Sequence, residues 1–429
     1  MFNLKSTLLI CLTCHVMVNN IHAQPCIKQT LKPDQRLLHQ IEGYLDESVT
    51  QYKYLMELLP DGQLPRTYEN GQLLTTSPYG WVSGFYPGTL LYLYEFAADS
   101  TLLNEIHKYL NVLEPLQMVT NHHDLGFMMY CSFGNAYRLF HEPRHRDILA
   151  QSAQSLASRF YPSVGSIKSW EKVKSLDGTH TLEFPVIIDN MMNLELLFFA
   201  SKITNDPRFR EIAISHAENT IRDHLRPDYS SYHVVNYDVA TGKVLSRETQ
   251  QGYAHNSAWS RGQAWGIYGF TMTYRETAKK KYLKVAQKMA DYFINHENLP
   301  EDKIPYWDFH AEQPGYTPPQ GYNPGQYEAV PRDASAAAIV ASALIELASY
   351  VDKKTSKKYL GTAEQILQSL SAPSYRAAAG TNGGFLLQHS SGGVPGNIEV
   401  DVPLSYADYY YVEALMRYRK LGNKRKIDQ

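Results

Sequence analysis

Residues 189–203 read Asp-Asn-Met-Met-Asn-Leu-Glu-Leu-Leu-Phe-Phe-Ala-Ser-Lys-Ile, and this stretch decides the fold. A short polar signature leads into a run that is apolar nearly all round. A helix with this pattern is buried on every side rather than along one stripe. Residues 334–348 repeat the pattern with smaller side chains, Ala-Ser-Ala-Ala-Ala-Ile-Val-Ala-Ser-Ala-Leu-Ile-Glu-Leu-Ala. We therefore expect inner helices that an outer layer of helices covers.

Outward from this stretch, the spacing of apolar residues indicates a mainly helical chain. No segment alternates with period two for long enough to demand a large sheet, although short strands are compatible with 230–248 and 381–390. The periodicity predicts twelve helices, at 36–59, 86–98, 101–116, 126–140, 144–159, 190–203, 207–223, 258–276, 279–295, 334–350, 355–370 and 404–420.

Every second predicted helix is entered through a short signature of polar, aromatic and small residues. The signatures are Trp81-Val82-Ser83-Gly84-Phe85, His123-Asp124-Leu125-Gly126-Phe127, Asp189-Asn190-Met191-Met192-Asn193, Trp259-Ser260-Arg261-Gly262-Gln263, Arg332-Asp333-Ala334-Ser335-Ala336 and Ser405-Tyr406-Ala407-Asp408-Tyr409. Such a repeat favours six helical hairpins closed into an all-α, (α/α)6 barrel, with the six signatures around one mouth. The alternative, an open solenoid, predicts polar capping helices at both ends, and these are not clear in the sequence.

Long insertions at 160–187, 224–257, 296–331 and 371–403 precede predicted inner helices and so belong to the mouth. Functional residues concentrate in such loops. The chain has 32 tyrosines, many beside Gly, Pro or Asn, and the flat apolar face and polar edge of Tyr and Trp suit a sugar ring. For any one tyrosine, ordinary packing is the alternative.

The first 23 residues are typical of a secretory signal peptide. Lys5 precedes an apolar run from Leu8 to Val18, and Ala23 provides the small residue at the cleavage site. A membrane anchor is excluded because the run is too short to span a bilayer. We expect an exported protein, periplasmic or secreted, with residues 24–429 as one barrel domain. Beyond the signal only Cys26 and Cys131 remain, so a large apolar core rather than a disulfide framework must hold the fold.

Composition and motifs exclude several functions. A net charge of -2 and a pI near 6.8 give no basic excess for nucleic acid. No phosphate-binding loop, dinucleotide fingerprint, nucleophile elbow or paired CxxC is present, so we expect no cofactor. Adjacent His122, His123 and Asp124 without a spaced partner are a weak metal signal, and we expect no metal.

Carboxylates are then the remaining candidates for catalysis. Asp124 and Asp189 each stand directly before an apolar helix, where capping and catalysis are equally compatible with the pattern. The apolar neighbours of Asp189 favour its protonated form, whereas the histidines beside Asp124 would keep that carboxyl ionised. The two carboxyls are therefore expected to differ in charge.

Several of these motifs together resemble the unsaturated glucuronyl hydrolases, glycoside hydrolase family 88. The resemblance runs in order along nearly the whole chain after the signal and implies the same (α/α)6 barrel. It rests on residues 81–85, 123–127, 188–193, Gln250-Gln251-Gly252-Tyr253, Trp259-Ser260-Arg261-Gly262-Gln263-Ala264-Trp265, 332–336 and Asp401-Val402-Pro403-Leu404.

The resemblance also implies roles for individual residues. Asp189 matches the general acid and base, and Asp124 the second carboxylate. The positions that match substrate-binding residues are His233, Gln251, Arg261 and Trp265, with Trp81 and Trp170 as sugar-stacking residues. A guanidinium can also grip a uronate carboxylate in a two-pronged fork; for Arg261 the alternative is a structural ion pair.

The resemblance implies a glycoside hydrolase that removes a 4,5-unsaturated glucuronic acid from the non-reducing end of oligosaccharides left by polysaccharide lyases, of glycosaminoglycan or ulvan type. The reaction would be hydration of the C4=C5 double bond. A non-catalytic periplasmic glycan-binding protein and an epimerase on the same barrel are the alternatives. Family members that prefer a 6-sulfated hexosamine carry a Ser-x-x-Ser-x-Lys pattern, whose lysine is missing from residues 387–392. We therefore expect no preference for a 6-sulfate. The oligomeric state stays open.

Overall fold

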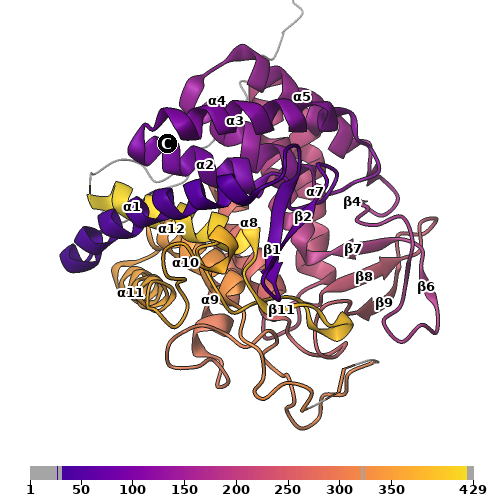
Figure 1. Ribbon diagram of the computed structural model, residues 1–429. Helices are drawn as coiled ribbons and strands as arrows, with labels where there is room; N and C mark the ends of the chain where they lie inside the picture. Colours follow the sequence, from indigo (N-terminus) through magenta and orange to yellow (C-terminus); the bar gives the residue numbers. More distant parts are fainter. Residues whose placement is uncertain (1–26, 28–30, 320–321, 324, 423–429) are drawn as a thin grey trace, which may run out of the picture.

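The computed structural model describes residues 27, 31–319, 322–323 and 325–422, so the predicted signal peptide, residues 1–23, lies outside the described residues. The described part is built on twelve α-helices (Figure 1). Their bounds are α1 Gln35–Leu58, α2 Phe85–Ala97, α3 Ser100–Leu113, α4 Asn135–Phe140, α5 Pro143–Ala157, α6 Leu194–Thr204, α7 Pro207–Asp223, α8 Ser260–Thr277, α9 Lys280–Asn295, α10 Ala334–Ala348, α11 Lys353–Leu370 and α12 Ser405–Gly422.

The even-numbered helices form a closed inner ring. Helix α10 contacts α8 and α12, α12 contacts α2, and the ring continues through α4 and α6 with the short helices that precede them, back to α8. The odd-numbered helices pack outside, α9 against α8 and α11 against α10 among them. This closure confirms the (α/α)6 barrel and excludes the open solenoid.

Inner and outer helices differ as the sequence pattern requires. Every residue of α10 is buried, as expected for a helix with neighbours on all sides. Helix α9 instead buries one stripe at helical spacing, Tyr282, Leu283, Val285, Ala286, Met289, Ala290 and Phe293. Several outer helices begin at an aspartate whose carboxylate accepts backbone N–H groups, as Asp99 does for α3 and Asp352 for α11. The main hydrophobic core includes residues from Leu37 to Tyr418.

Two inner helices begin with turns that are not α-helical. A π-helix, η2 (Gly126–Gly134), precedes α4, and a 3-10 helix, η3 (Ile188–Asn193), precedes α6. A Cβ on Gly126 would lie only 2.4 Å from the Asn193 Cα, so the two irregular turns pack backbone against backbone. The predicted helices 126–140 and 190–203 are therefore right in place but wrong in their first turns.

The strands are short and lie in the loops that lead into inner helices. Strands β7 (Pro185–Ile187), β8 (Val234–Tyr237) and β9 (Val244–Glu248) form an antiparallel sheet at one side of the ring (Figure 1). This confirms a strand region within 230–248. The segment 381–390 holds mainly a 3-10 turn, with its pairing displaced to β10 (Ser390–Gly393) and β11 (Ile398–Val402). The hairpin β1 (Leu64–Glu69) and β2 (Gln72–Thr76) was not expected. Two further hairpins join β3 (Phe160–Tyr161) to β4 (Ser166–Ile167) and β5 (Val173–Lys174) to β6 (Thr181–Leu182).

Candidate active site at the mouth of the helix ring

Asp189 is placed by the three-stranded sheet and by η3. It follows β7 directly, and the register pairs Ile187 of β7 with Val234 of β8. The Ile188 N–H donates to the His233 carbonyl at 3.0 Å. Residues distant in sequence are thereby adjacent, and His233 Nε2 lies 3.8 Å from Asp189 Oδ1.

Asp189 is a buried carboxyl that its surroundings leave without a fixed hydrogen-bond partner at Oδ1. Burial raises its pKa to about 7, a rise that the Arg261 guanidinium opposes and the Asp124 carboxylate reinforces. The Trp265 indole N–H is near enough to favour the ionised form slightly, yet it is not in hydrogen-bonding geometry. No side-chain capping bond forms at the start of η3, so the capping interpretation of Asp189 is wrong. Such a carboxyl can hold and release a proton near neutral pH.

His233 is a neutral donor. Its Nδ1 accepts the backbone N–H groups of Gln250 and Gln251 at 3.0 and 3.2 Å, so the ring hydrogen must be on Nε2, the atom that faces Asp189. Burial lowers the pKa of His233 to about 3. The buried Nε2–H has no partner among the described residues, and it is therefore available to an oxygen brought by a substrate.

Asp124 is held opposite Asp189 by the contact between η2 and η3. Asn193 donates through Nδ2 to Asp124 Oδ1 at 3.3 Å, and its Oδ1 accepts the Phe127 N–H at 3.0 Å. The start of η2 also lacks a side-chain cap, so Asp124 is not an N-cap. Its Oδ2 instead lies 3.2 Å from His123 Nε2. The irregular turns thus fix the carboxyls of two inner helices.

Arg261 has a different environment from the one expected. Its guanidinium donates to Asp333 at 2.9 Å, to the Gly392 carbonyl at 2.5 Å and to the Ser391 carbonyl. The predicted fork for a substrate carboxylate is therefore occupied by protein groups, and the geometry is that of the structural ion pair considered as the alternative. Gln251 also donates to the Gly392 carbonyl, at 2.9 Å, so both residues fix the 391–392 loop. Direct substrate contact by either residue stays a prediction.

The three predicted tryptophans surround the carboxyls at different depths. Trp265 is fully buried against Phe127, while Trp81 is half-buried and packs on Phe127 and Tyr406. Trp170, also half-buried, stands with its ring edge toward His233 at a centroid distance of 6.1 Å. Trp81 and Trp170 can therefore offer an accessible face to a sugar. Trp265 can offer only its N–H edge.

Several residues of the site were not singled out from the sequence. Asp333 pairs with Arg261, Asn190 binds His123, and the buried Tyr406 hydroxyl has no hydrogen-bond partner among the described residues. His123 itself was considered only as a weak metal ligand and as a neighbour that keeps Asp124 ionised. All four belong to the signatures that open inner helices, and that shared position was the available signal. No group of three or more His, Cys, Asp or Glu side chains suited to a metal is found within the described ranges.

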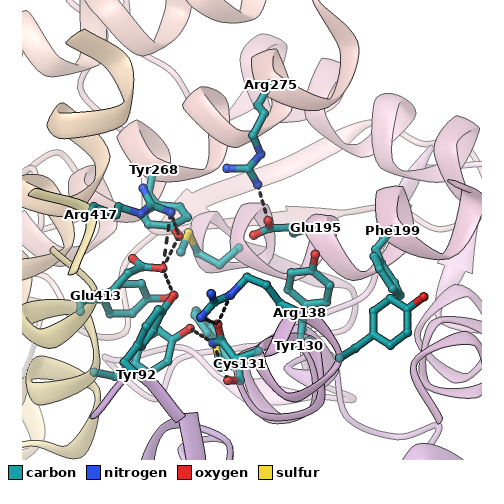
Figure 2. Close-up of a pocket in the computed structure, with 18 of the residues that line it drawn as sticks. Tyr92, Tyr130, Cys131, Arg138, Glu195, Phe199, Tyr268, Arg275, Glu413 and Arg417 are labelled. Carbon is teal, nitrogen blue, oxygen red and sulfur yellow. Dashed lines mark hydrogen bonds and ion pairs between the residues drawn. The ribbon is translucent and has the colours of Figure 1, made fainter. Parts of the chain in front are cut away.

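A cavity of about 600 Å³ lies among the inner helices and is lined by residues of α2, η2, α4, η3, α6, α8 and α12; Asp189 is not among its lining residues (Figure 2). Its charged groups are paired: Arg275 binds Glu195 and, at 2.9 Å, Glu346, while Arg417 binds Glu413 at 3.4 Å. Cys131, free and half-buried, lies in its wall, and desolvation raises the pKa of this thiol. Within the described part of the chain, no helix is both long and apolar enough to cross a bilayer.

Known proteins similar to this chain are hydrolases of unsaturated uronides. No family model matches. The chain is 43% identical to an unsaturated glucuronyl hydrolase of Formosa agariphila, over 80% of each sequence. It is 33% identical to an unsaturated chondroitin disaccharide hydrolase of Streptococcus agalactiae, over 79% of this chain and 81% of the relative. The crystal structure of an unsaturated glucuronyl hydrolase specific for heparin superposes with a TM-score of 0.82 at 42% identity, covering 91% of this chain and 99% of the other.

Proposed function

This chain belongs to the unsaturated glucuronyl hydrolases, and on that premise we propose that Asp189 transfers the proton that starts the reaction. The protein is a glycoside hydrolase that removes a 4,5-unsaturated glucuronic acid from the non-reducing end of oligosaccharides. The alternatives of a glycan-binding protein without turnover and of an epimerase have no support, because the similar proteins are hydrolases.

The observation that carries the assignment is the state of the Asp189 carboxyl. It is buried, its pKa is raised to about 7, and its Oδ1 has no partner. A general acid works best when its pKa is near the working pH. No other predicted site residue offers a transferable proton in this way, since His233 has its pKa lowered to about 3.

The chemistry follows from the double bond of the substrate. Protonation of C4 by Asp189 leaves positive charge at C5, which the ring oxygen shares. Asp189, now a carboxylate, takes a proton from the water that adds its oxygen to C5. The resulting hemiketal opens to a ketone, C1 becomes an aldehyde, and the rest of the oligosaccharide leaves with its oxygen. Because C1 is never attacked directly, the carboxylate spacing rule for ordinary glycosidases does not apply.

The neighbours of Asp189 would bind and orient the sugar. The His233 Nε2–H and the Trp265 N–H can donate to substrate oxygens, and Asp124 can accept from ring hydroxyls. Trp81 and Trp170 would stack on sugar faces, because each keeps part of its ring exposed. Arg261 and Gln251 would hold the 391–392 loop in place.

For the parent polymer, we propose a glycosaminoglycan-derived disaccharide without a requirement for a 6-sulfate. Similar proteins act on heparin and chondroitin products. Gly392 stands where the missing lysine would offset the desolvation of a sulfate. Rates with matched 6-sulfated and unsulfated unsaturated disaccharides should therefore be similar. A marked preference for the 6-sulfated form would show that another cation serves this position.

Residues 1–23 support an exported enzyme, periplasmic or secreted, that meets its substrate outside the cytoplasm. Fractionation of cells that express the full chain would test this, and recovery of the uncleaved protein in the cytoplasm would contradict it.

Solvent hydrogen provides the test of the reaction. Hydration must form a new C–H bond at C4, whereas an ordinary glycosidase protonates only the bridging oxygen. In heavy water, product sampled early should carry deuterium at C4, and a saturated glucuronide should not be cleaved. Early sampling matters because the new methylene lies beside a ketone and exchanges later. Product without deuterium at C4, or equal cleavage of saturated glucuronides, would contradict hydration. Asp189 would then be assigned as an acid that protonates the bridging oxygen of the leaving group.

A further inference from the structure

Arg159 is a buried arginine just after the outer helix α5, and its side chain joins two of the segments that lead to the mouth. Only 5% of the residue is exposed. Its guanidinium donates to the carbonyls of Lys168 at 2.9 Å, Ser169 at 3.1 Å and Thr120 at 3.1 Å, and to the Glu171 carboxylate at 2.7 Å. Its own carbonyl accepts the Lys168 N–H at 3.0 Å. Arg159 is therefore fixed to the 168–171 segment by main chain and side chain together.

These hydrogen bonds enclose Trp170, because Ser169 and Glu171 are its two neighbours in the chain. The Trp170 ring is half-buried, packs on a small apolar cluster that includes Ile187, and turns its edge toward His233. A ring that is already held in its binding orientation saves the free energy of ordering it when the ligand arrives. Arg159 acts on the backbone that sets this orientation.

We infer that Arg159 is a positioning residue that holds Trp170 in place to stack on the substrate. It does not contact the sugar itself, since it is buried and its hydrogen bonds go to protein groups. The inference rests on the proposed function, because it gives Arg159 a part in the same sugar site.

The arrangement depends on the shape of the guanidinium and not only on its charge. Four of the five N–H groups of Arg159 are used, and their directions are fixed by one plane. A lysine has a single donor nitrogen and cannot reach acceptors that lie on several sides of a planar fork. Arg159→Lys therefore keeps the positive charge and loses the geometry.

The two carboxyls of the site have anchors that do not involve Arg159. The Asp124 N–H donates to His122 Nδ1 at 3.1 Å, and its carboxylate accepts from Asn193 at 3.3 Å. Asp189 follows strand β7, which pairs with β8. Loss of the Arg159 fork should therefore weaken sugar binding more than the chemical step.

Kinetics of Arg159→Lys with an unsaturated disaccharide test this division. KM should rise roughly three- to tenfold, the range of an aromatic contact, while kcat stays within about twofold. Trp170→Ala should show the same pattern. Arg159→Lys added to Trp170→Ala should raise KM no further, because the ring through which Arg159 acts is then absent. A wild-type KM in Arg159→Lys would overturn the inference, as would independent, additive increases in the double variant.

Arg275→Lys is the matched control, since Arg275 is also buried and forms ion pairs with Glu195 and Glu346, remote from Trp170 in sequence. It should lower the free energy of unfolding and leave KM unchanged. An equal rise of KM in this control would overturn the inference, because general loosening would then explain both. If Arg159→Lys does not fold, Glu171→Ala removes one of the four bonds from a side chain that is 64% exposed. Its KM should rise by about twofold, and an unchanged KM would overturn the inference.

Fluorine NMR of enzyme labelled with 5-fluorotryptophan measures the position of the ring without substrate. The Trp170 signal, identified by its loss in Trp170→Phe, should shift or broaden in Arg159→Lys and stay unchanged in Arg275→Lys. An unmoved Trp170 signal in Arg159→Lys would overturn the inference. Failure of the wild type to consume an unsaturated disaccharide would instead reject the proposed function, while the fluorine result would stand.

Discussion

The two ends of the helix ring differ in how their buried polar groups are satisfied. Around Asp189, several buried atoms lack hydrogen-bond partners among the described residues, namely Asp189 Oδ1, His233 Nε2, Trp265 Nε1, His123 Nε2 and the Tyr406 hydroxyl. At the far end, the Glu413 carboxylate accepts from Tyr92 and Tyr268 at 3.0 Å each and also pairs with Arg417. Yet the cavity of about 600 Å³ is lined by Glu413 and Arg417 and not by Asp189 (Figure 2).

The difference teaches that open space alone does not identify the reacting site. A buried polar atom without a partner costs free energy, about 1–3 kcal/mol for a neutral group. Such atoms persist where a substrate will satisfy them. At the far end the charged side chains already pair with one another, as in a structural cluster. A ligand would find few polar groups there that need a partner. Predictions from this comparison therefore set Asp189 against well-satisfied acids elsewhere in the chain.

The largest expected effect is on turnover. Asp189→Asn should lower kcat by roughly 10²–10⁴, the usual contribution of general acid–base catalysis. The matched control is Asp408, which is also buried with a pKa raised to about 7 by burial. Its oxygens are occupied by Tyr52 and the N–H groups of Leu386 and Leu387. Asp408→Asn should therefore keep near wild-type turnover below its melting temperature. Equal losses in both variants would break the comparison.

The next effect is on stability at the far end. Glu413→Gln should lower the free energy of unfolding by about 3 kcal/mol, because breaking a buried ion pair leaves a charge undercompensated. Of these two carboxylates, Arg417 would retain Glu346, at 3.1 Å. Denaturant unfolding measures the loss, and kcat should be unchanged. A drop in kcat with normal stability would mean that the far end takes part in the reaction.

Asp189→Asn should raise the free energy of unfolding at alkaline pH, the opposite of the effect expected for Glu413→Gln. The folded pKa of Asp189, about 7, is above its ordinary value of 3.8, so between these values the folded state keeps a proton that the unfolded state releases. The wild type therefore loses stability as pH rises from about 4 to 7, by at most about 4 kcal/mol. At pH 8 the variant should be the more stable protein, and below pH 4 the two should agree. A variant less stable at pH 8 would contradict this.

The smallest effect concerns the pH profile of the wild type. Since Asp189 must be protonated to act, kcat/KM should fall about tenfold for each pH unit above 7. In Asp408→Asn, kcat/KM should fall over the same pH range, because only the pKa of Asp189 determines where the fall begins. A shifted pH dependence in Asp408→Asn would mean that the charge of Asp408 influences Asp189.

How far the sequence anticipated the fold depended on the kind of helix. Amphipathic α9 and all-buried α10 were predicted within two residues, because side-chain spacing reports directly which faces are buried. The turns at Gly126 and Ile188 were not, since the contact of Gly126 with Asn193 that accompanies them joins residues remote in sequence. The hairpin β1–β2 was missed for a similar reason, because part of its pairing is with the distant Leu404 region.

The sequence by itself determined the ring, the mouth and the residue types around it. The apolar periodicity, the signatures and the resemblance led to the barrel, to Asp189 and Asp124, and to the aromatic and polar residues near them. Only the tertiary structure decided their states: that Asp189 is uncapped with a pKa near 7, that His233 donates from Nε2, and that Arg261 is already paired with Asp333. Burial depth, hydrogen direction and ion pairing depend on side chains that the fold brings together from different helices, and sequence spacing contains no information about those contacts.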